Sequence, residues 1–276
     1  FRKLHAAGCF VLPNPWDAGS AVYLEHLGFQ ALATTSAGFA FSRALPDSVS
    51  AVPRELMLQH IREIAAATSL PVNADFLSGF ADNPEGVAES VALCIATGIA
   101  GLSIEDSSGR SAAPLYDFEL AVARIKAARA AIDAAGIPVV LTARCEAFLV
   151  GESDPLAVAL RRLVAFAAAG ADCLYAPGVS EPGAIEAIVR AVEPKPVNVL
   201  VSKFNSNLTV TRLKDLGVRR ISVGSALANV AWGAFMQAAQ NILETGSFTS
   251  LASGAQFSEL NELFTSRRKG QYARTK

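Results

Sequence analysis

Acidic side chains follow two short apolar segments that lie about one strand and one helix apart in the chain. Asp75 ends the segment P-V-N-A-D, and Glu105 and Asp106 end the segment G-L-S-I-E-D. In a parallel β/α protein the carboxyl ends of the strands meet on one face, so these three acids are expected to lie close together. Carboxylates at close range repel each other unless a proton or cation lies between them, and an all-oxygen ligand set favours Mg²⁺ or Mn²⁺ over zinc. The alternative is that these acids only cap the helices that follow.

Two further features at predicted strand ends would recognise an anion. The small-residue turn Thr35-Ser36-Ala37 offers hydroxyl and backbone N–H donors, and Arg144 in L-T-A-R can bind a carboxylate through two parallel hydrogen bonds. Together with the acids, these residues predict a site for a small anionic oxo acid. A cation beside its 2-oxo group would stabilise an enolate, which is the intermediate in cleaving the bond at the adjacent carbon.

The elements that must position these residues follow a repeating pattern. Short apolar runs alternate with long Ala-rich segments of helical periodicity, and glycines such as Gly136 and Gly170 lie where helices would end. Asp17, Asn83 and Asp154 mark helix starts. Eight such β/α pairs over about 220 residues predict an α/β fold, a (β/α)8 TIM-type barrel, rather than an open doubly wound sheet. The predicted strands are residues 9–12, 31–35, 72–75, 101–105, 139–143, 173–175, 197–201 and 220–223.

Composition narrows the class of protein. The chain has 276 residues, of which 51% are hydrophobic, which suits one large domain with an extensive core. It carries 24 basic and 25 acidic side chains, so there is no electrostatic footprint for nucleic acid or an anionic membrane. No apolar run approaches the roughly 20 residues that span a bilayer. The cysteines lack metal-type or disulfide spacing, and we expect a reduced, cytoplasmic protein.

The C-terminal part is expected to differ from the rest. We predict a barrel domain over residues 1–245 and a helical extension over residues 246–276 that ends in the basic tail R-R-K-G-Q-Y-A-R-T-K. The extension is expected to pack on a neighbouring subunit. Gly224 and Ser225, after the last predicted strand, either offer backbone N–H groups to a phosphate or simply begin a helix.

Six motifs occur in an order that resembles the isocitrate lyase/phosphoenolpyruvate mutase superfamily. They are N-P-W-D-A-G-S-A, T-T-S-A-G-F-A, L-P-D-S, V-N-A-D, S-I-E-D and L-T-A-R, and the resemblance covers residues 8–240. It implies an α/β barrel whose last helix is exchanged between the subunits of a homodimer or homotetramer. It also implies the use of Mg²⁺ on small 2-oxo or 2-hydroxy carboxylates.

The resemblance implies a role for individual acids. Asp75 matches the second acid of the family's Asp-x-Asp, Glu105 matches the Glu of its fourth strand, and Asp47 matches an acid that helps to hold water on the metal. Asn73 stands where the family has the first acid of Asp-x-Asp, so either Asn73 is a neutral metal ligand or Asp75 takes the direct role. The implied metal set is therefore Asp75, Asn73, Glu105 and Asp47.

The resemblance also implies how the substrate is bound. Arg144 resembles the arginine that orients the substrate, and Glu146 matches an acid just beyond it. The turn of residues 35–37 lies where the family binds the carboxylate or phosphonate end of its ligand. Asn198 and Tyr175 either point into the cavity or complete the inner packing of the barrel.

The segment after the fourth strand departs from the family. Isocitrate and methylisocitrate lyases carry Lys-Arg-Cys-Gly-His there, with the Cys as acid/base, whereas residues 107–116 are S-S-G-R-S-A-A-P-L-Y. A true isocitrate or methylisocitrate lyase is therefore disfavoured. Arg110 either replaces the loop lysine of the family as an anion contact or is solvated.

The sequence thus predicts a Mg²⁺-dependent lyase that cleaves a C–C bond of a small oxo or hydroxy dicarboxylate through an enolate, with oxaloacetate decarboxylation as one example. Arg144, Glu105 and Asp47 would be its catalytic residues, and Asn198 would help to bind the substrate. Two alternatives stay open. One is P–C bond chemistry, as in phosphonopyruvate mutases or hydrolases, and the other is a barrel that binds oxo acids without turnover.

Overall fold

The computed structural model describes residues 1–203, 205 and 208–274, with side chains as far as residue 266, and it divides into two compact units. Unit 1 comprises Phe1–Ala226 and unit 2 comprises Leu227–Lys276. The main sheet has eight strands in the order β1-β10-β9-β8-β7-β4-β3-β2, and its paired strands are all parallel. The strands are β1 (Phe10–Leu12), β2 (Leu32–Ala33), β3 (Val72–Asp75), β4 (Gly101–Glu105), β7 (Val140–Arg144), β8 (Cys173–Tyr175), β9 (Val197–Leu200) and β10 (Arg220–Ser222).

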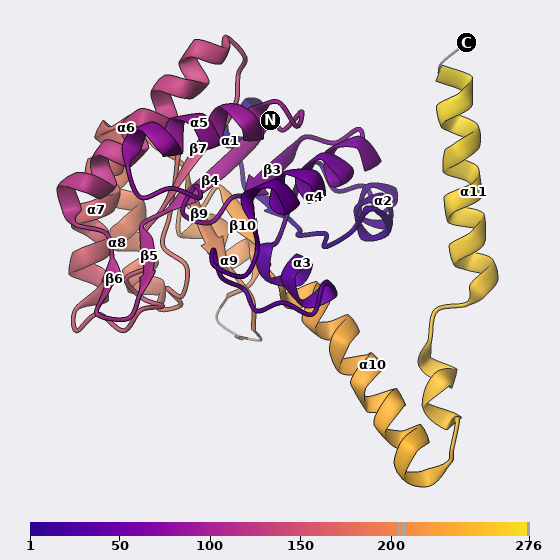
Figure 1. The fold of residues 1–276 in the computed structure, drawn as a ribbon. Coiled ribbons are helices and arrows are strands. Elements are labelled where there is room, and N and C mark those ends of the chain that lie inside the picture. Colours follow the sequence, from indigo (N-terminus) through magenta and orange to yellow (C-terminus); the bar gives the residue numbers. More distant parts are fainter. Residues whose placement is uncertain (204, 206–207, 275–276) are drawn as a thin grey trace. The chain divides into compact units, whose positions relative to one another are not determined.

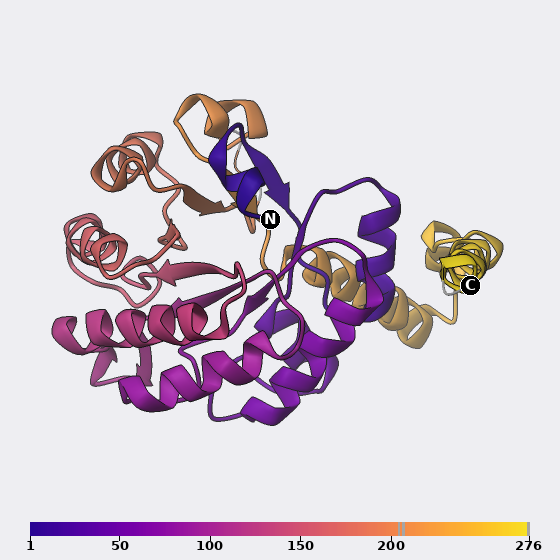
Figure 2. The same cartoon turned by 90° about the horizontal axis from the view of Figure 1, so that it is seen from above.

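Helices cover the outside of these strands (Figures 1 and 2). The segment after the fourth predicted strand, which departs from the family, forms an antiparallel hairpin of β5 (Ser107–Arg110) and β6 (Ala113–Leu115). The helices of unit 1 are α1 (Arg2–Ala6), α2 (Ala18–His26), α3 (Ser36–Ser42), α4 (Arg54–Ala67), α5 (Pro84–Ile95), α6 (Phe118–Ala135), α7 (Pro155–Ala168), α8 (Pro182–Val192) and α9 (Val210–Asp215).

Asn14 ties together the two edge strands, β1 and β2, and the neighbouring β10. Its Nδ2 donates to the Thr34 carbonyl at 2.9 Å, and its Oδ1 accepts from the N–H groups of Val223 at 3.0 Å and Gly224 at 2.9 Å. The Ala33 N–H also donates to the carbonyl of Pro13 at 3.0 Å. These bonds bring the sheet close to full closure, which confirms the predicted (β/α)8 barrel, and each of the eight predicted strands overlaps an observed one.

The local signals in the sequence act where they were expected. Side-chain oxygens of Asp17, Asn83 and Asp154 accept from backbone N–H groups in the first turns of α2, α5 and α7. Gly136 ends α6 in the left-handed conformation with φ of 68°, where a side chain would be strained. These stops let each helix turn back toward the next strand.

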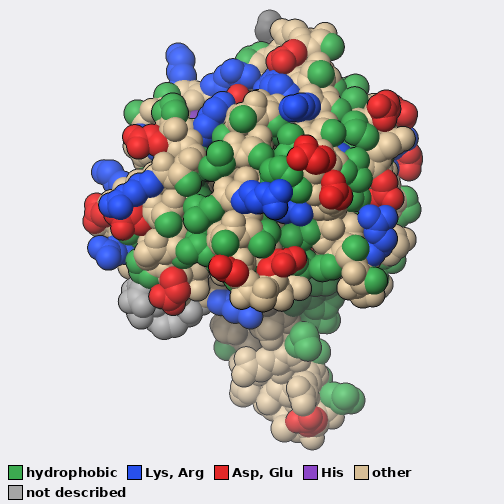
Figure 3. Space-filling model, turned by 90° about the vertical axis from the view of Figure 1, so that its left-hand side faces the viewer, with side chains coloured by type: hydrophobic (Ala, Val, Ile, Leu, Met, Phe, Trp, Pro, Cys, Tyr) green, Lys and Arg blue, Asp and Glu red, His purple; other side chains and the backbone are tan. Residues whose placement is uncertain are grey.

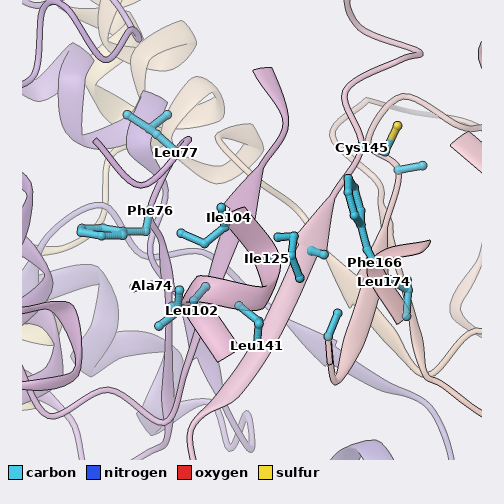
Figure 4. Packing of buried hydrophobic residues seen from close by; sticks show 14 of the residues in the cluster. Ala74, Phe76, Leu77, Leu102, Ile104, Ile125, Leu141, Cys145, Phe166 and Leu174 are labelled. Atoms are coloured by element: carbon cyan, nitrogen blue, oxygen red, sulfur yellow. The ribbon is translucent and has the colours of Figure 1, made fainter. Parts of the chain in front are cut away.

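The apolar core lies between the outer face of the strands and the helices. Ile104 and Leu141 on the strands pack with Ile125 of α6 and Phe166 of α7, and all four are almost completely buried (Figure 4). The inner face of the barrel is instead polar. Buried inward residues include Asn73, Ser103, Thr142, Asn198, Arg220 and Ser222. Barrels usually fill this space with branched aliphatic side chains, so this one keeps a polar cavity by holding its apolar core outside the strands.

Unit 2 consists of α10 (Ala226–Thr245), the short 3₁₀ helix η1 (Thr249–Ser253) and α11 (Phe257–Arg274). Its helix α11 lies in the range 246–276 that the sequence assigned to a helical extension. The division at Ala226 lies inside the range 1–245 that the sequence assigned to the barrel, and that domain assignment stays a prediction. Side chains of the basic tail, from residue 267 onward, lie outside the described residues.

The molecular surface matches the balanced charge of the chain. On the face shown in Figure 3, basic and acidic side chains are interspersed, and neither sign forms a continuous patch. Among the described helices, none combines the length and the apolar character needed to cross a membrane.

Gly101 on β4 lies close to three neighbouring groups and gives a test of packing. We expect Gly101→Ala to lower the free energy of unfolding by about 1–3 kcal/mol, because overpacked cores shift or strain. An added Cβ would lie 2.7 Å from the Phe1 ring, 2.8 Å from Asn73 Oδ1 and 3.1 Å from the Val140 carbonyl. Gly183→Ala on α8 is the control, because its Cβ would meet nothing within 4 Å. Equal urea unfolding midpoints for the two variants would contradict the prediction.

Candidate active site

A cavity of about 290 Å³ opens at the carboxyl ends of the strands. It reaches from Ser202 and Ser225 down to Asn73 and Arg220 inside the barrel. The residues that the sequence selected are mostly in its wall, since Thr35, Ser36, Ala37, Asp47, Asn73, Asp75, Arg144, Tyr175 and Asn198 all line it. An adjoining hollow is lined by Glu105 and Glu146, together with Asp47 and Arg144 from the main cavity. The strand ends therefore converge on one polar site, as the barrel prediction required.

Arg144 lies among three carboxylates. Its Nη1 contacts Asp75 Oδ1 at 2.9 Å, and its Nη2 contacts Glu105 Oε2 at 3.1 Å and Glu146 Oε1 at 2.9 Å. The three acids come from β3, from β4 and from the segment after β7. One positive charge against three negative charges leaves this cluster with an excess of two negative charges when all are ionised. The structure thus brings Asp75 and Glu105 together through Arg144.

Burial shapes the proton affinities of this cluster. Burial raises the pKa of Glu105 well above its ordinary value of 4.5, Arg144 opposes the shift, and the Glu146 and Asp75 carboxylates add to it. Burial likewise raises the pKa of Glu146 against the effect of Arg144. Partial desolvation and the Asp75 carboxylate raise the pKa of Asp47. A bound cation would relieve this repulsion, because a positive charge favours the ionised carboxylates.

The donor set fits a hard divalent cation. Asp75, Asp47 and Glu105 offer only oxygen, which Mg²⁺ and Mn²⁺ prefer. Among the described residues, no three metal-binding side chains already form a metal-sized group. Because the Arg144 guanidinium bonds to both Asp75 and Glu105, these acids are linked through it. The carboxylates suit a cation bound partly through water, and Arg144 sets how closely they can approach it.

Asn73 is oriented away from a ligand role. Its Oδ1 faces Arg220 Nη1 at 3.5 Å, and its Nδ2 donates to the Ala74 carbonyl at 3.2 Å. In contrast, Asp75 Oδ2 accepts from the Ser36 N–H at 3.0 Å and keeps its carboxylate at the cavity wall. Of these two residues, Asp75 is therefore the one that could hold a metal directly.

The expectation that Asp106 joins the acidic cluster is wrong. Its Oδ2 contacts Arg162 Nη1 of α7 at 3.1 Å, and its Oδ1 accepts from the Glu146 N–H at 2.8 Å. Successive residues of an extended strand face opposite sides, so Glu105 faces the cavity and Asp106 faces the surrounding helices. Asp106 therefore holds the backbone that carries Glu146 and does not line the cavity.

Some hydrogen-bond donors of the turn of residues 35–37 already have partners within the protein. Thr35 caps α3, since its Oγ1 accepts from the Gly38 N–H at 3.2 Å. The Ser36 N–H is already donated to Asp75. The N–H of Gly224, which the sequence offered to a phosphate, is likewise donated to Asn14. The turn lines the cavity as predicted, although fewer of its backbone donors are free than the sequence suggested.

Asn198 and Tyr175 both reach the cavity. The guanidinium carbon of Arg144 lies 5.2 Å from the centroid of the Tyr175 ring. Burial raises the pKa of the Tyr175 phenol, which stays protonated at neutral pH. Asn198 Nδ2 donates to Ser222 Oγ at 2.9 Å. Of the two alternatives from the sequence, the structure thus supports the cavity position for both residues.

Sequence reasoning missed Arg220 and Ser222 on β10. Both line the cavity, and both are buried, at 2% and 7% exposed. Alternation along R-R-I-S would have placed residues 220 and 222 on one face. Polar residues at alternate positions of a predicted strand, one of them charged, were the signal that could have found this site.

The β5–β6 hairpin stands in place of the family's Cys-containing loop. Arg110 pairs with Asp82 at 3.4 Å on the surface, and its guanidinium carbon lies 5.6 Å from the centroid of the Tyr116 ring. Ser107 and Gly109 border the hollow beside the cavity. Arg110 is thus engaged outside the cavity, and a catalytic role for it has no support in this geometry.

Unit 1 has the fold and the site of a (β/α)8-barrel enzyme, with acids and an arginine at the strand ends. The chain matches the family model described as phosphoenolpyruvate phosphomutase over residues 1–243, and it belongs to this family. The resemblance to the isocitrate lyase/phosphoenolpyruvate mutase superfamily is thereby confirmed.

Solved structures agree with this assignment. A provisionally assigned lyase/mutase from Burkholderia cenocepacia J2315 has a TM-score of 0.91 and 46% sequence identity, covering 96% of this chain and 94% of that chain. The complex of a phosphonopyruvate hydrolase with oxalate and Mg²⁺ has a TM-score of 0.82 and 25% identity, covering 95% of this chain and 92% of that chain.

Relatives with named activities fall in two groups. The 2-methylisocitrate lyase of Escherichia coli K12 is 32% identical over 199 residues, which is 69% of this chain and 64% of that protein. The oxaloacetate decarboxylase of Paraburkholderia xenovorans LB400 is 32% identical over 195 residues, which is 67% of this chain and 62% of that protein. Both of these relatives are lyases, which supports an enzyme.

Removal of Arg162 tests the support behind the site. We expect Arg162→Met to lower the free energy of unfolding by about 3–5 kcal/mol, because it leaves the Asp106 carboxylate buried and unpaired. Arg161→Met is the matched control, since the neighbouring Arg161 is exposed over the Phe118 ring and should contribute no more than about 1 kcal/mol. Urea unfolding of both variants measures the difference. Similar losses would show that the Arg162–Asp106 pair is not a support.

Glu105 should make stability depend on pH. Because the pKa of Glu105 is raised in the folded protein, the folded form binds more protons than the unfolded form between pH 4.5 and the raised pKa. The free energy of unfolding therefore falls as the pH rises through this range. Glu105→Gln removes this penalty. In EDTA the variant should melt at a higher temperature than the parent at pH 8, and the gap should shrink toward pH 4.5. A gap that does not change with pH would contradict the assignment.

Proposed function

We propose that this protein is a Mg²⁺-dependent lyase that cleaves a C–C bond of a small 2-oxo or 2-hydroxy dicarboxylate through an enolate. The observation that carries the proposal is the group of Asp75, Glu105 and Glu146 around Arg144 beside a cavity at the strand ends. Oxaloacetate decarboxylation is the first reaction to test, because an oxaloacetate decarboxylase is among the relatives.

In the proposed site, Asp75, Asp47 and Glu105 hold the divalent cation, directly or through water. The all-oxygen donor set, the excess negative charge and the raised pKa values of Glu105 and Asp47 support this assignment. The Mg²⁺ in the related phosphonopyruvate hydrolase complex supports it further. The cation supplies positive charge beside the 2-oxo group of the substrate. Mn²⁺ is expected to substitute for it.

The residues of the chain bind and orient the substrate. Arg144 and the turn of residues 35–37 receive carboxylate oxygens, and Asn198 lies in the wall of the same cavity. In oxaloacetate the C3–C4 bond breaks, C4 leaves as CO₂, and the electron pair stays on C3 as the enolate of pyruvate. A proton from solvent then adds to C3. Arg144 favours this reaction by holding the planar carboxylate in place.

P–C bond chemistry is the second candidate. The structure of a phosphonopyruvate hydrolase is similar over 95% of this chain, and residues 107–115 contain neither the Cys nor the His that isocitrate and methylisocitrate lyases carry there. Turnover of phosphonopyruvate without turnover of oxaloacetate would favour this candidate.

A binding protein without turnover is the third candidate. The neutral Asn73, with its Oδ1 toward Arg220, motivates it, because the site then has one acid fewer than the family pattern. Tight ligand binding without turnover across oxo acids and phosphonates would favour it. Loss of measurable turnover in Asp75→Ala would instead rule it out.

We propose in addition that the protein forms a homodimer or homotetramer. Several large apolar side chains of unit 2 are exposed, and we expect an assembly to cover them. These side chains are Val230, Phe235, Met236, Leu243, Phe248 and Phe257. Light scattering after size exclusion tests the assembly. The cytoplasmic location stays a prediction from the sequence.

Oxalate provides a test of the enolate site that needs no turnover, because it is a flat mimic of the pyruvate enolate. At a hundred times its dissociation constant it should stabilise the protein by about 2.7 kcal/mol, which raises the melting temperature by roughly 5 °C or more. The shift should require Mg²⁺ and disappear in EDTA. Asp75→Asn should abolish it, whereas Asp82→Asn, an exposed acid outside the cavity, should keep it. No shift with Mg²⁺ or Mn²⁺ would remove the lyase proposal.

A further inference from the structure

Arg220 is a buried cation at the floor of the cavity. Its side chain lies on β10, is 2% exposed and lines the cavity. Its Nε donates to Asn198 Oδ1 at 2.9 Å, and its Nη2 donates to Thr142 Oγ1 at 3.0 Å. Its Nη1 faces His5 Nε2 at 3.4 Å and Asn73 Oδ1 at 3.5 Å. Side chains from four parts of the barrel thus fix the guanidinium in place.

These four partners carry no negative charge. Burial and the charge of Arg220 lower the pKa of His5 to about 3, so this imidazole is neutral at physiological pH. Within the described part of the chain, Arg220 makes no ion pair, whereas Arg144 contacts three carboxylates. A buried guanidinium without a counter-charge is unfavourable, and an anion brought to it gains from the low local dielectric.

The hydrogen bonds around Arg220 run in one direction and do not use all the donors of this side chain. Arginine has only donors, so Asn198 turns its Oδ1 to Arg220 and donates through Nδ2 to Ser222 Oγ at 2.9 Å. Tyr175 lines the same cavity as Arg220, and its phenol O–H is a second donor in that wall. Of the five guanidinium N–H groups, four have the partners named above. Among the described residues the fifth, on Nη2, has no partner and can donate to a ligand.

We propose that Arg220 and the Tyr175 hydroxyl form an anion subsite at the cavity floor, which binds one carboxylate of a dicarboxylate substrate. The inference rests on the proposed function, since it takes the same cavity as the substrate site, and it assigns the second carboxylate of the dicarboxylate to Arg220. Arg144 does not fill this role alone, because its guanidinium is already paired with acids. The chain then separates two tasks. Acids near the cavity mouth hold the cation, and Arg220 at the floor holds the far end of the substrate.

Malonate in EDTA is the probe, because it carries two carboxylates and needs no metal. We expect Arg220→Met to weaken malonate binding, measured by calorimetry, about ten- to a hundredfold, the contribution of a hydrogen bond to a charged group. Arg219→Met, at the residue just before β10, is the matched control. The Arg219 guanidinium donates to the Gly8 carbonyl at 3.1 Å and lies outside the cavity lining, so its loss should change the affinity less than about twofold.

A second variant covers the case in which Arg220→Met does not fold. Asn73→Asp leaves Arg220 in place and supplies a carboxylate in the position of the amide oxygen, 3.5 Å from its Nη1. The internal acid should compete with malonate and weaken its binding by about tenfold or more in EDTA, with no loss of melting temperature. Unchanged malonate affinity in this variant, or in a folded Arg220→Met, overturns the proposal. Failure of the parent protein to bind malonate also overturns it.

Oxalate with Mg²⁺, measured on the same samples, separates this inference from the proposed function. Normal oxalate binding by the parent together with malonate binding that does not depend on Arg220 would remove the subsite and leave the lyase proposal standing. Malonate binding that depends on Arg220, without any response to oxalate and Mg²⁺ or Mn²⁺, would remove the lyase proposal and leave the subsite.

Discussion

The ion pairs between Arg144 and the acids around it hold the carboxyl end of the barrel together. Asp75, Glu105 and Glu146 approach within 2.9–3.1 Å of a single guanidinium. Carboxylates with so little access to water repel one another strongly, and the arginine makes their proximity tolerable. It does not neutralise them, so the site keeps an excess of negative charge. That excess suits a cation, and Arg144 itself remains close enough to contact an anion.

Support for this cluster comes from outside the barrel. Arg162 on α7 pairs with Asp106, and Asp106 accepts from the Glu146 N–H. The residue that the sequence grouped with the metal acids is therefore part of the scaffold that fixes one of them. A strand end can serve both purposes because adjacent residues face opposite sides, one toward the cavity and one toward the helices.

The barrel can have a polar interior because its apolar core lies between the strands and the helices. Ile104, Leu141 and Phe166 pack between strands and helices, so the inner face can carry Asn73, Asn198 and Arg220. Asn73 and Arg220 belong together in this arrangement. An acid at position 73 would pair with Arg220 and cancel its charge, whereas the amide accepts a hydrogen bond and leaves that charge in place. The amide of Asn73, which stands where the family has an acid, is thus matched to the charge of Arg220 on β10.

Much of the fold was readable from the sequence, because its signals are local. Apolar runs of strand length, the caps Asp17, Asn83 and Asp154, and the helix-ending glycines each act within one β/α unit. Eight such units predict a barrel, and a parallel barrel places Asp75, Glu105 and Arg144 on one face. Only the tertiary structure decided how these residues divide their bonds. The ties of Arg144 to three acids, the outward turn of Asp106 and the burial of Arg220 depend on contacts between strands far apart in the chain. Spacing along one strand carries no information about which charge another strand will bring beside it.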